Sequence, residues 1–271
     1  MFAIYKQIMK DVYKQAVLAA IAGGEEILSI YNTDFEVEYK GDNSPLTLAD
    51  QKANEAIVEK LKPLGIPMIS EENKNKTFAE RQNWSQCWII DPLDGTKEFV
   101  KRNGEFTVNI ALVRNQKPTF GVIYVPVTKE LFIGLVEENK AYKLVWDEKK
   151  NFEDNFIDVK LLNPTESEKM RVVGSRSHMN EDTQQFIEEL KTKQNKPVEI
   201  VSKGSSLKFC LVAEGLADVY PRFAPTMEWD TAAGQAICEA VSLQVIDQKT
   251  QKPMVYNREN LLNNYFLVTK S

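Results

Sequence analysis

The sequence has few residues of the types that bind zinc or copper. Its 271 residues include one histidine, His178, and three scattered cysteines, Cys87, Cys210 and Cys238, without C-x-x-C spacing. Protein sites for zinc and copper draw mainly on nitrogen and sulfur ligands from these two residue types. If the chain binds a metal, its ligands must therefore be carboxylates, which favour a hard cation such as Mg²⁺.

Signals for export and for a membrane span are also missing. An odd number of scattered cysteines is typical of reduced thiols in the cytosol and not of a disulfide framework. Charged residues occur throughout the N-terminal segment, and no apolar run approaches the roughly 18 residues of a membrane span. We expect a soluble cytoplasmic chain, while the sequence leaves peripheral contact with a membrane surface open.

Positive charge is in deficit. The 34 lysines and arginines are outnumbered by 39 aspartates and glutamates, which gives a net charge of −5. A protein that binds nucleic-acid backbone usually has a basic surface, so we expect no nucleic-acid partner, although a local basic pocket is compatible with this balance. A Ser-His-Asp triad would depend on His178, and the G-x-S-x-G motif of many hydrolases is missing.

The hydrophobic pattern of the first half predicts helices followed by an antiparallel sheet. Apolar residues recur every three or four positions from about Asp11 to Tyr31, which indicates an amphipathic helix. A second helix is predicted after an N-cap at Thr47 because Ala49, Ala53, Ile57 and Leu61 share one face. Short apolar runs then predict strands at 67–70, 87–90, 107–113, 120–125 and 131–136.

In the second half, predicted strands and helices alternate. We expect strands at 171–174, 198–201, 217–220 and 243–246, and helices at 180–190, 206–213 and 231–241. The pattern predicts an α+β or α/β layered sandwich, with a helix-plus-antiparallel-sheet lobe followed by an α/β lobe. With a boundary at the charged stretch 147–154, the lobes comprise residues 1–155 and 156–271 and form one catalytic unit.

Acidic residues gather where predicted strands end and helices begin. Glu71 and Glu72 follow the strand at 67–70, Asp91 follows the strand at 87–90, and Asp230 precedes the helix at 231–241. Such positions are where α/β proteins place their sites. In the segment DPLDGT at 91–96, the proline fixes φ and the glycine permits a tight turn. Asp91 and Asp94 can therefore point to one spot, with the Leu93 carbonyl between them.

Each acidic feature also has a structural explanation when taken alone. Glu71 and Glu72 fit a solvated surface pair, Asp230 fits a helix N-cap, and DPLDG fits a type I turn. The complete hexad between a buried strand and an aromatic residue is much rarer. Converging carboxylates repel one another unless cations neutralise them. Together these features predict a site for two or three Mg²⁺ ions of the kind used in phosphoryl chemistry.

Three motifs in the same order resemble those of a known group of enzymes. SEE at 70–72, DPLDGT at 91–96 and WDTAAG at 229–234 are similar to the motifs of the inositol monophosphatase superfamily of Mg²⁺-dependent, lithium-sensitive phosphatases. Residues 40–42 and 44–50 resemble its first signature loop and helix. The stretches at 97–99, 103–113, 174–178, 204–209 and 225–237 resemble the CysQ-type 3′(2′),5′-bisphosphate nucleotidases, which act in sulfur metabolism.

The resemblance implies an αβαβα sandwich that removes the 3′-phosphate of 3′-phosphoadenosine 5′-phosphate, leaving AMP, by direct attack of a metal-activated water. The first Mg²⁺ would be held by Glu71, Asp91 and the Leu93 carbonyl. The second would be held by Asp91, Asp94 and Asp230. Asp50 and Thr96 would orient the water and accept its proton. Inhibition by Li⁺ is implied as well, with the second ion site as the place of exchange.

A second phosphate group would need its own binding residues. Ser205 and Lys208 lie three residues apart at a predicted helix start and would share one face, and Arg222 would add a further charge. Simple helix capping and solvated side chains explain the same residues. The substrate contacts implied by the resemblance are Glu71, Leu93, Asp94, Gly95, Thr96, His178, Ser205, Lys208, Arg222 and Asp230.

Two other functions stay open at this point. The substrate could be an inositol or sugar monophosphate, which would leave Ser205, Lys208 and Arg222 without a role in binding. The chain could also be a non-catalytic protein that senses a nucleotide or a metal, although such a protein would be free to lose Asp50 or Thr96. The oligomeric state is open too, with a homodimer as one option.

Overall fold

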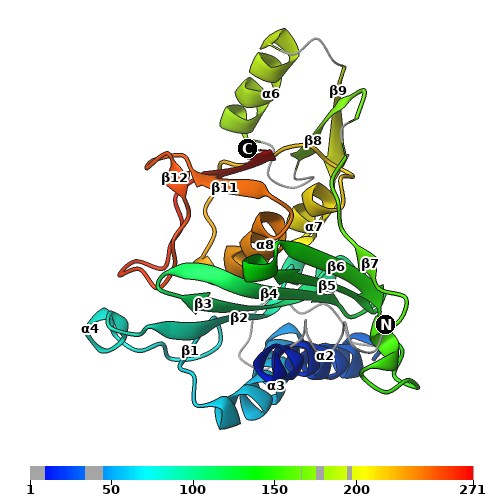
Figure 1. The fold of residues 1–271 in the computed structure, drawn as a ribbon, viewed down its shortest axis with the longest axis vertical. Helices are drawn as coiled ribbons and strands as arrows, with labels where there is room; N and C mark the ends of the chain where they lie inside the picture. Colours follow the sequence, from blue (N-terminus) through cyan, green and yellow to red (C-terminus); the bar gives the residue numbers. More distant parts are fainter. Residues whose placement is uncertain (1–9, 34–44, 166, 175–179, 194–196, 271) are drawn as a thin grey trace.

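Helices and sheets alternate in five layers in the computed structural model, which describes residues 10–33, 45–165, 167–174, 180–193 and 197–270. Figure 1 shows helices α2 and α3 beneath a large sheet, α7 and α8 on its other side, and a second sheet with α6 beyond. This arrangement confirms the predicted layered sandwich. The division into lobes at residue 155 stays a prediction.

The large sheet has seven strands in sequential order. Its first two strands pair in parallel and all its other neighbours pair antiparallel, as predicted for the meander. The strands are β1 (Met68–Ser70), β2 (Gln86–Asp94), β3 (Thr107–Arg114), β4 (Lys117–Val125), β5 (Glu130–Leu135), β6 (Lys140–Val145) and β7 (Lys160–Leu161).

Both faces of this sheet are buried because its side chains alternate between two hydrophobic clusters. Trp88 and Ile90 belong to the cluster that includes α2 (Asp11–Tyr31) and α3 (Pro45–Leu61). Cys87 and Ile89 belong to the cluster formed with the C-terminal helices. The first helix has the predicted bounds. Thr47 lies inside α3, so the predicted N-cap there is wrong: the helix has already begun at Pro45, which suits a first turn because proline has no amide hydrogen.

The C-terminal part adds three helices and a four-stranded antiparallel sheet in the order β10-β13-β11-β12. A parallel pair, β8 with β9, lies beside it and is linked to it by the bridge between Val172 and Val219. The elements are β8 (Met170–Gly174), α6 (Glu181–Lys193), β9 (Val198–Ser202), α7 (Leu207–Ala213), β10 (Tyr220–Arg222), α8 (Glu228–Glu239), β11 (Leu243–Asp247), β12 (Lys252–Pro253) and β13 (Phe266–Lys270).

Two bounds in this part differ from the prediction in ways that matter for the site. The strand expected at 217–220 begins only at Tyr220 and continues to Arg222, so Arg222 lies on a strand. The helix expected at 231–241 begins at Glu228 and already contains Asp230. The following elements, most of them short, were not predicted: α4 (Phe78–Arg81), α5 (Thr96–Val100), β6, β7, β12, β13 and the 3₁₀ turns η1 (Lys62–Leu64), η2 (Val136–Glu138) and η3 (Asp154–Phe156).

None of the helices in the described ranges combines the length and the apolar character that crossing a bilayer requires.

Candidate active site: a carboxylate cluster beside a cationic pocket

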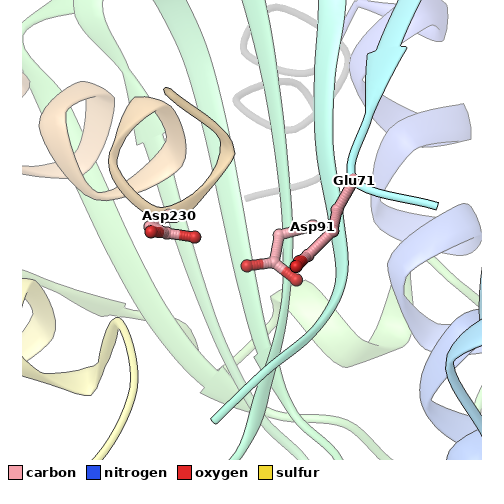
Figure 2. Close-up of side chains that lie close together, drawn as sticks. All are labelled: Glu71, Asp91 and Asp230. Carbon is pink, nitrogen blue, oxygen red and sulfur yellow. The ribbon is translucent and has the colours of Figure 1, made fainter. Parts of the chain in front are cut away.

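Three carboxylates from three separate elements meet above the large sheet. Figure 2 shows Asp91 on β2 between Glu71, which follows β1, and Asp230 on α8. One carboxylate oxygen from each residue lies within 4.8 Å of those of the other two. Of the predicted acidic residues, the fold thus brings Glu71, Asp91 and Asp230 into one potential metal site.

Asp94 lies beside this cluster at an irregularity in β2. The pairing of β2 with β3 shifts register between Asp91 and Asp94, so that both carboxylates leave the regular alternation of the strand. The Leu93 amide donates to Asp91 Oδ1 at 3.1 Å, which is the turn chemistry expected of DPLDGT. Asp94 Oδ2 accepts the Ser206 amide and, at 3.4 Å, the Asn109 side-chain amide.

The backbone before Glu71 is held by a side-chain network. The Asn75 side chain accepts from the Ser70 amide at 3.0 Å and donates to the Ser70 carbonyl at 2.9 Å. Ser70 Oγ also donates to Asn54 of α3 at 2.8 Å, and Asn54 donates to Asn73. The loop after β1 is therefore tied to itself and to α3, which fixes the direction in which Glu71 leaves the strand.

Asp230 is oriented by the first turn of α8. Its Oδ2 accepts the Met227 amide at 2.7 Å, which is how a residue at the third helical position caps the helix. The predicted N-cap position of Asp230 is therefore wrong by three residues, although its capping function is real. The other carboxylate oxygen is left for the cluster.

In the cluster, several carboxylates lie close together with little contact with water, so their ionised forms are destabilised. Burial and the neighbouring Asp94 raise the pKa of Asp91 well above its usual range, and burial and Asp94 raise that of Asp230 to about 7. Burial and Glu72 raise the pKa of Glu71 to about 7, although part of this residue reaches the surface. Burial and Glu72 also raise the pKa of Asp50 to about 8.

Asp50 lies on α3 and is 8% exposed. Its Oδ1 atom has no hydrogen-bond partner in the part of the chain that the structure describes. A buried carboxylate oxygen without a donor is costly, which indicates that something outside the chain is expected to contact it. Thr96 begins α5 just after Gly95 and is exposed. Gly95 has φ of 96°, and a Cβ there would lie 3.1 Å from Ser205 Cβ, so a side chain would push the two loops apart.

A cavity of about 140 Å³ lies beside Asp94 and Asp230, and its lining also includes cationic side chains. Ser205, Lys208 and Arg222 line it, and so do Lys97, Glu98 and Lys203. Two of the predicted metal ligands, Asp94 and Asp230, therefore share one pocket with the residues predicted to bind a second phosphate.

Lys208 and Arg222 in this pocket have N–H groups that make no hydrogen bond with the described residues. Lys208 is 7% exposed, and its ammonium donates to the Ser205 carbonyl at 2.6 Å. Burial lowers the pKa of Lys208 to about 8. Arg222 donates one bond, to the Pro225 carbonyl at 3.3 Å, and its buried Nε has no partner among the described residues. Uncommitted donors on two cations are suited to an anion.

Some predicted contacts fall outside this picture, and some contacts were not predicted. His178 lies outside the described residues. Leu93 is buried, and its backbone amide donates to Asp91 Oδ1. Asn54, Asn75, Asn109 and Ser206 were missed, because hydrogen bonds between residues far apart in the chain leave no periodic signal. For Ser206 alone there was a hint, since it lies in the stretch at 204–209.

Comparison with known proteins places the chain in a family. The family model described as "Inositol monophosphatase family" matches residues 8–269. The 3′(2′),5′-bisphosphate nucleotidase CysQ of Salmonella typhimurium is 43% identical over 260 residues, covering 94% of this chain and 98% of that protein. CysQ of Escherichia coli (strain K12) is 43% identical over 251 residues, covering 91% and 94%.

Solved structures agree with this. The crystal structure of CysQ from Bacteroides thetaiotaomicron superposes with a TM-score of 0.87 at 48% identity, covering 95% of this chain and 96% of that one. An inositol monophosphatase from Thermotoga maritima, at 20% identity and a TM-score of 0.71, shares the fold. The match along nearly the whole sequence, together with the acidic cluster in the same fold, shows that the protein belongs to the inositol monophosphatase family.

Proposed function

We propose that this enzyme is a Mg²⁺-dependent phosphomonoesterase that removes the 3′-phosphate of 3′-phosphoadenosine 5′-phosphate, giving AMP and phosphate. The observation that carries the proposal is a pocket whose lining combines the carboxylates Asp94 and Asp230 with the cations Lys208 and Arg222. A substrate with two phosphates can use both kinds of group, the carboxylates through bound metal ions and the cations directly, whereas a monophosphate uses one kind. The relatives named as 3′(2′),5′-bisphosphate nucleotidases support the same substrate.

The carboxylate residues fit a hard cation. The donors are carboxylate oxygens, their pKa values are raised by burial and by one another, and a buried oxygen of Asp50 has no donor among the residues that the structure describes. A divalent ion would offset the mutual repulsion of these carboxylates, and oxygen ligands favour Mg²⁺. Glu71, Asp91 and the Leu93 carbonyl would hold one ion, and Asp91, Asp94 and Asp230 a second.

When bound, such ions lower the pKa of a water molecule and neutralise charge on the phosphate and on the leaving oxygen. The chain's own groups then have separate tasks. Asp50 accepts a proton from the attacking water, for which a pKa raised toward neutrality is suited. Thr96 orients that water together with Asp50. Ser205, Lys208 and Arg222 hold the 5′-phosphate, and His178 contacts the nucleotide. We place the enzyme in the cytoplasm.

The test is phosphate release from three substrates, with Mg²⁺ and with a chelator in its place. The substrates are 3′-phosphoadenosine 5′-phosphate, adenosine 3′-monophosphate and inositol 1-phosphate. We expect the first to have the highest kcat/KM and all activity to require the metal. Preference for inositol 1-phosphate would refute the substrate, and metal-bound protein without turnover of any of the three would favour a sensing role.

A variant separates the role of the cations from that of the carboxylates. Lys208→Met keeps the aliphatic stem and removes the charge. Because a charge-assisted hydrogen bond contributes about 1.5–3 kcal/mol, we expect kcat/KM for the bisphosphate to fall roughly tenfold to a hundredfold. The value for adenosine 3′-monophosphate, which has no 5′-phosphate, should stay within about twofold. An equal loss on both substrates would contradict the assignment of Lys208 to the 5′-phosphate.

A further inference from the structure

A chain of buried hydrogen bonds connects strand β3 with the turn before α7 and ends on Asp94. Thr107 Oγ1 lies 2.8 Å from Ser206 Oγ, and Ser206 Oγ donates to Asn109 Oδ1 at 2.8 Å. The Asn109 amide then donates to Asp94 Oδ2 at 3.4 Å. The backbone amide of Ser206 donates to the same oxygen. Thr107, Asn109 and Ser206 are at most 3% exposed.

The direction of these bonds is set by their chemistry. The Ser206 hydroxyl gives its only hydrogen to Asn109 Oδ1, so the hydrogen between Ser206 and Thr107 belongs to Thr107. Accepting at Oδ1 fixes the amide of Asn109 with its NH₂ group toward Asp94. Every hydrogen in the chain therefore points toward Asp94 Oδ2, and such a chain polarises itself cooperatively.

The register of the sheet brings these groups together. Asp94 pairs with Thr107 across the β2–β3 ladder, and Asp91 pairs with Asn109. Asn109 thus lies opposite one metal ligand while its side chain reaches the other. Ser206 lies directly before α7, 112 residues from Asp94 in sequence, and is followed two residues later by Lys208.

We propose that Ser206 and Asn109 are positioning residues, which act as one unit to hold Asp94 Oδ2 so that Oδ1 is presented to the metal ion. The proposal rests on the metal site of the proposed function. Oδ1 accepts none of the bonds described, and Oδ2 is occupied by two donors. Without the Ser206 hydroxyl, the Asn109 amide can turn over and place its oxygen against the carboxylate, which repels it.

This geometry predicts how the effects of two single substitutions combine. Ser206→Ala removes the hydroxyl and keeps the backbone amide that bonds Asp94. Asn109→Ala removes the donor itself. Because the hydroxyl acts through the amide, the two changes should not add, whereas independent contacts would multiply their effects.

Calorimetric titration of the substrate-free protein with Mg²⁺ measures this without activity. We expect each single variant to weaken Mg²⁺ binding by about tenfold, in the range known for groups that orient metal ligands. The Mg²⁺ dissociation constant of the double variant Ser206→Ala/Asn109→Ala should be within about twofold of that of the single variant that binds Mg²⁺ more weakly. Losses that multiply in the double variant, or unchanged Mg²⁺ binding in the single variants, would overturn the proposal.

A matched control distinguishes positioning from plain stability. Asn155 is also a buried asparagine, and its side chain makes three hydrogen bonds, with Asp147 and Asn151, neither of which is a residue of the site. Asn155→Ala should lower the melting temperature as Asn109→Ala does and leave Mg²⁺ binding unchanged. If Asn155→Ala weakens Mg²⁺ binding equally, the effect in Asn109→Ala is one of stability and the proposal fails.

Kinetics give an independent readout. With the bisphosphate nucleotide as substrate, Ser206→Ala should need about tenfold more Mg²⁺ for half-maximal rate, while KM at saturating Mg²⁺ stays within about twofold. A variant that changes only KM would make Ser206 a substrate contact and overturn the positioning role. If the unmodified enzyme releases no phosphate from this nucleotide, the proposed substrate fails, while the calorimetric comparison still decides the role of Ser206 and Asn109.

Discussion

At the scale of single residues, the site consists of ionisable groups whose charged forms are destabilised by their surroundings. Asp91 and Lys208 are buried and Asp230 is partly buried, so water stabilises their ions poorly; the pKa values of the two aspartates are raised and that of Lys208 is lowered. Such groups respond strongly to a ligand of opposite charge. Their replacement therefore has opposite consequences for stability and for activity.

Asp94→Asn illustrates this opposition. The amide keeps the shape of the side chain but removes one charge from a cluster in which Asp94 raises the pKa values of Asp91 and Asp230. We expect turnover to fall by at least about a hundredfold while the melting temperature of the metal-free protein rises. Phosphate release and thermal melting in a chelator measure the two effects. Near-normal Mg²⁺-dependent turnover would show that Asp94 is not a ligand.

Lys208 predicts an alkaline limit for one substrate. Its pKa is lowered to about 8, mainly by burial, so the ammonium is present below that pH and is lost above it. The kcat/KM for 3′-phosphoadenosine 5′-phosphate should therefore decline as pH rises through about 8. The pH profile for adenosine 3′-monophosphate serves as the control, since it lacks the 5′-phosphate. An identical alkaline limb for both substrates would assign the decline to another group.

Asp230 predicts how lithium acts. Li⁺ is small enough for an oxygen site of Mg²⁺ size but brings half the charge, so it stabilises a leaving oxygen poorly. We expect Li⁺ to inhibit at concentrations where Na⁺ does not, in an uncompetitive or mixed manner, and Asp230→Asn to weaken this inhibition. Initial rates across a Li⁺ series measure both. Full activity at high Li⁺ would remove the reason for an exchangeable ion at Asp230.

At the scale of elements, the placement of Asp230 depends on how closely α8 approaches the large sheet. A Cβ added at Gly121 of β4 would lie 2.5 Å from the Ala233 carbonyl, and one at Gly134 of β5 would lie 2.6 Å from Ile237 Cα. Both obstacles are backbone atoms of α8, which cannot turn aside. Two glycines in neighbouring strands thus let this helix, and Asp230 with it, sit against the sheet.

Gly121→Ala tests that contact. Because overpacking a well-filled core costs about 1–3 kcal/mol, we expect the free energy of unfolding in urea to fall by that amount and the Mg²⁺ requirement to rise as α8 shifts. Gly23→Ala in α2 is a matched control: its Cβ meets the side chain of Ile57 at 2.8 Å, and alanine favours a helix by about 1 kcal/mol. That control should be nearly neutral. Equal effects would refute the role assigned to the backbone contact.

At the scale of the whole molecule, the acidic cluster links stability to pH and to metal. The folded-state pKa values of Asp50, Glu71 and Asp230 are raised to about 8, 7 and 7 from 3.8, 4.5 and 3.8. Between about pH 4 and 8 the metal-free folded state therefore binds more protons than the unfolded chain, and its stability falls as pH rises.

Bound Mg²⁺ should offset this loss. Protons compete with the ion for the same carboxylates, so we expect saturating Mg²⁺ to raise the melting temperature strongly at pH 8 and little at pH 5. Thermal melts at both pH values, with Na⁺ at equal ionic strength as the control, measure the difference. The same Mg²⁺-induced shift at both pH values would show that the cluster is not the binding site.

Much of the fold could be predicted from the sequence, because an element that buries one face repeats its apolar residues at a regular spacing. Helix α2 has the predicted bounds, and the strands of the meander follow their apolar runs, since each of these elements buries a full face. Short or edge elements such as β12 and α4 bury too little to leave such a pattern. The start of α3 before Thr47 was missed because helix propagation overrode a favourable local cap.

The amino-acid sequence alone establishes which chemistry is available: a surplus of acids, one histidine, and acidic residues placed at the ends of predicted elements. It also carried the resemblance that named the family. Which of these groups lie next to one another depends on how the layers pack. Hydrogen bonds such as those joining Ser206 and Asn109 to Asp94, and the burial that raises the pKa of Asp50, arise between residues far apart in the chain. Such contacts form only when the layers pack, so they leave no pattern in the sequence from which they could be predicted.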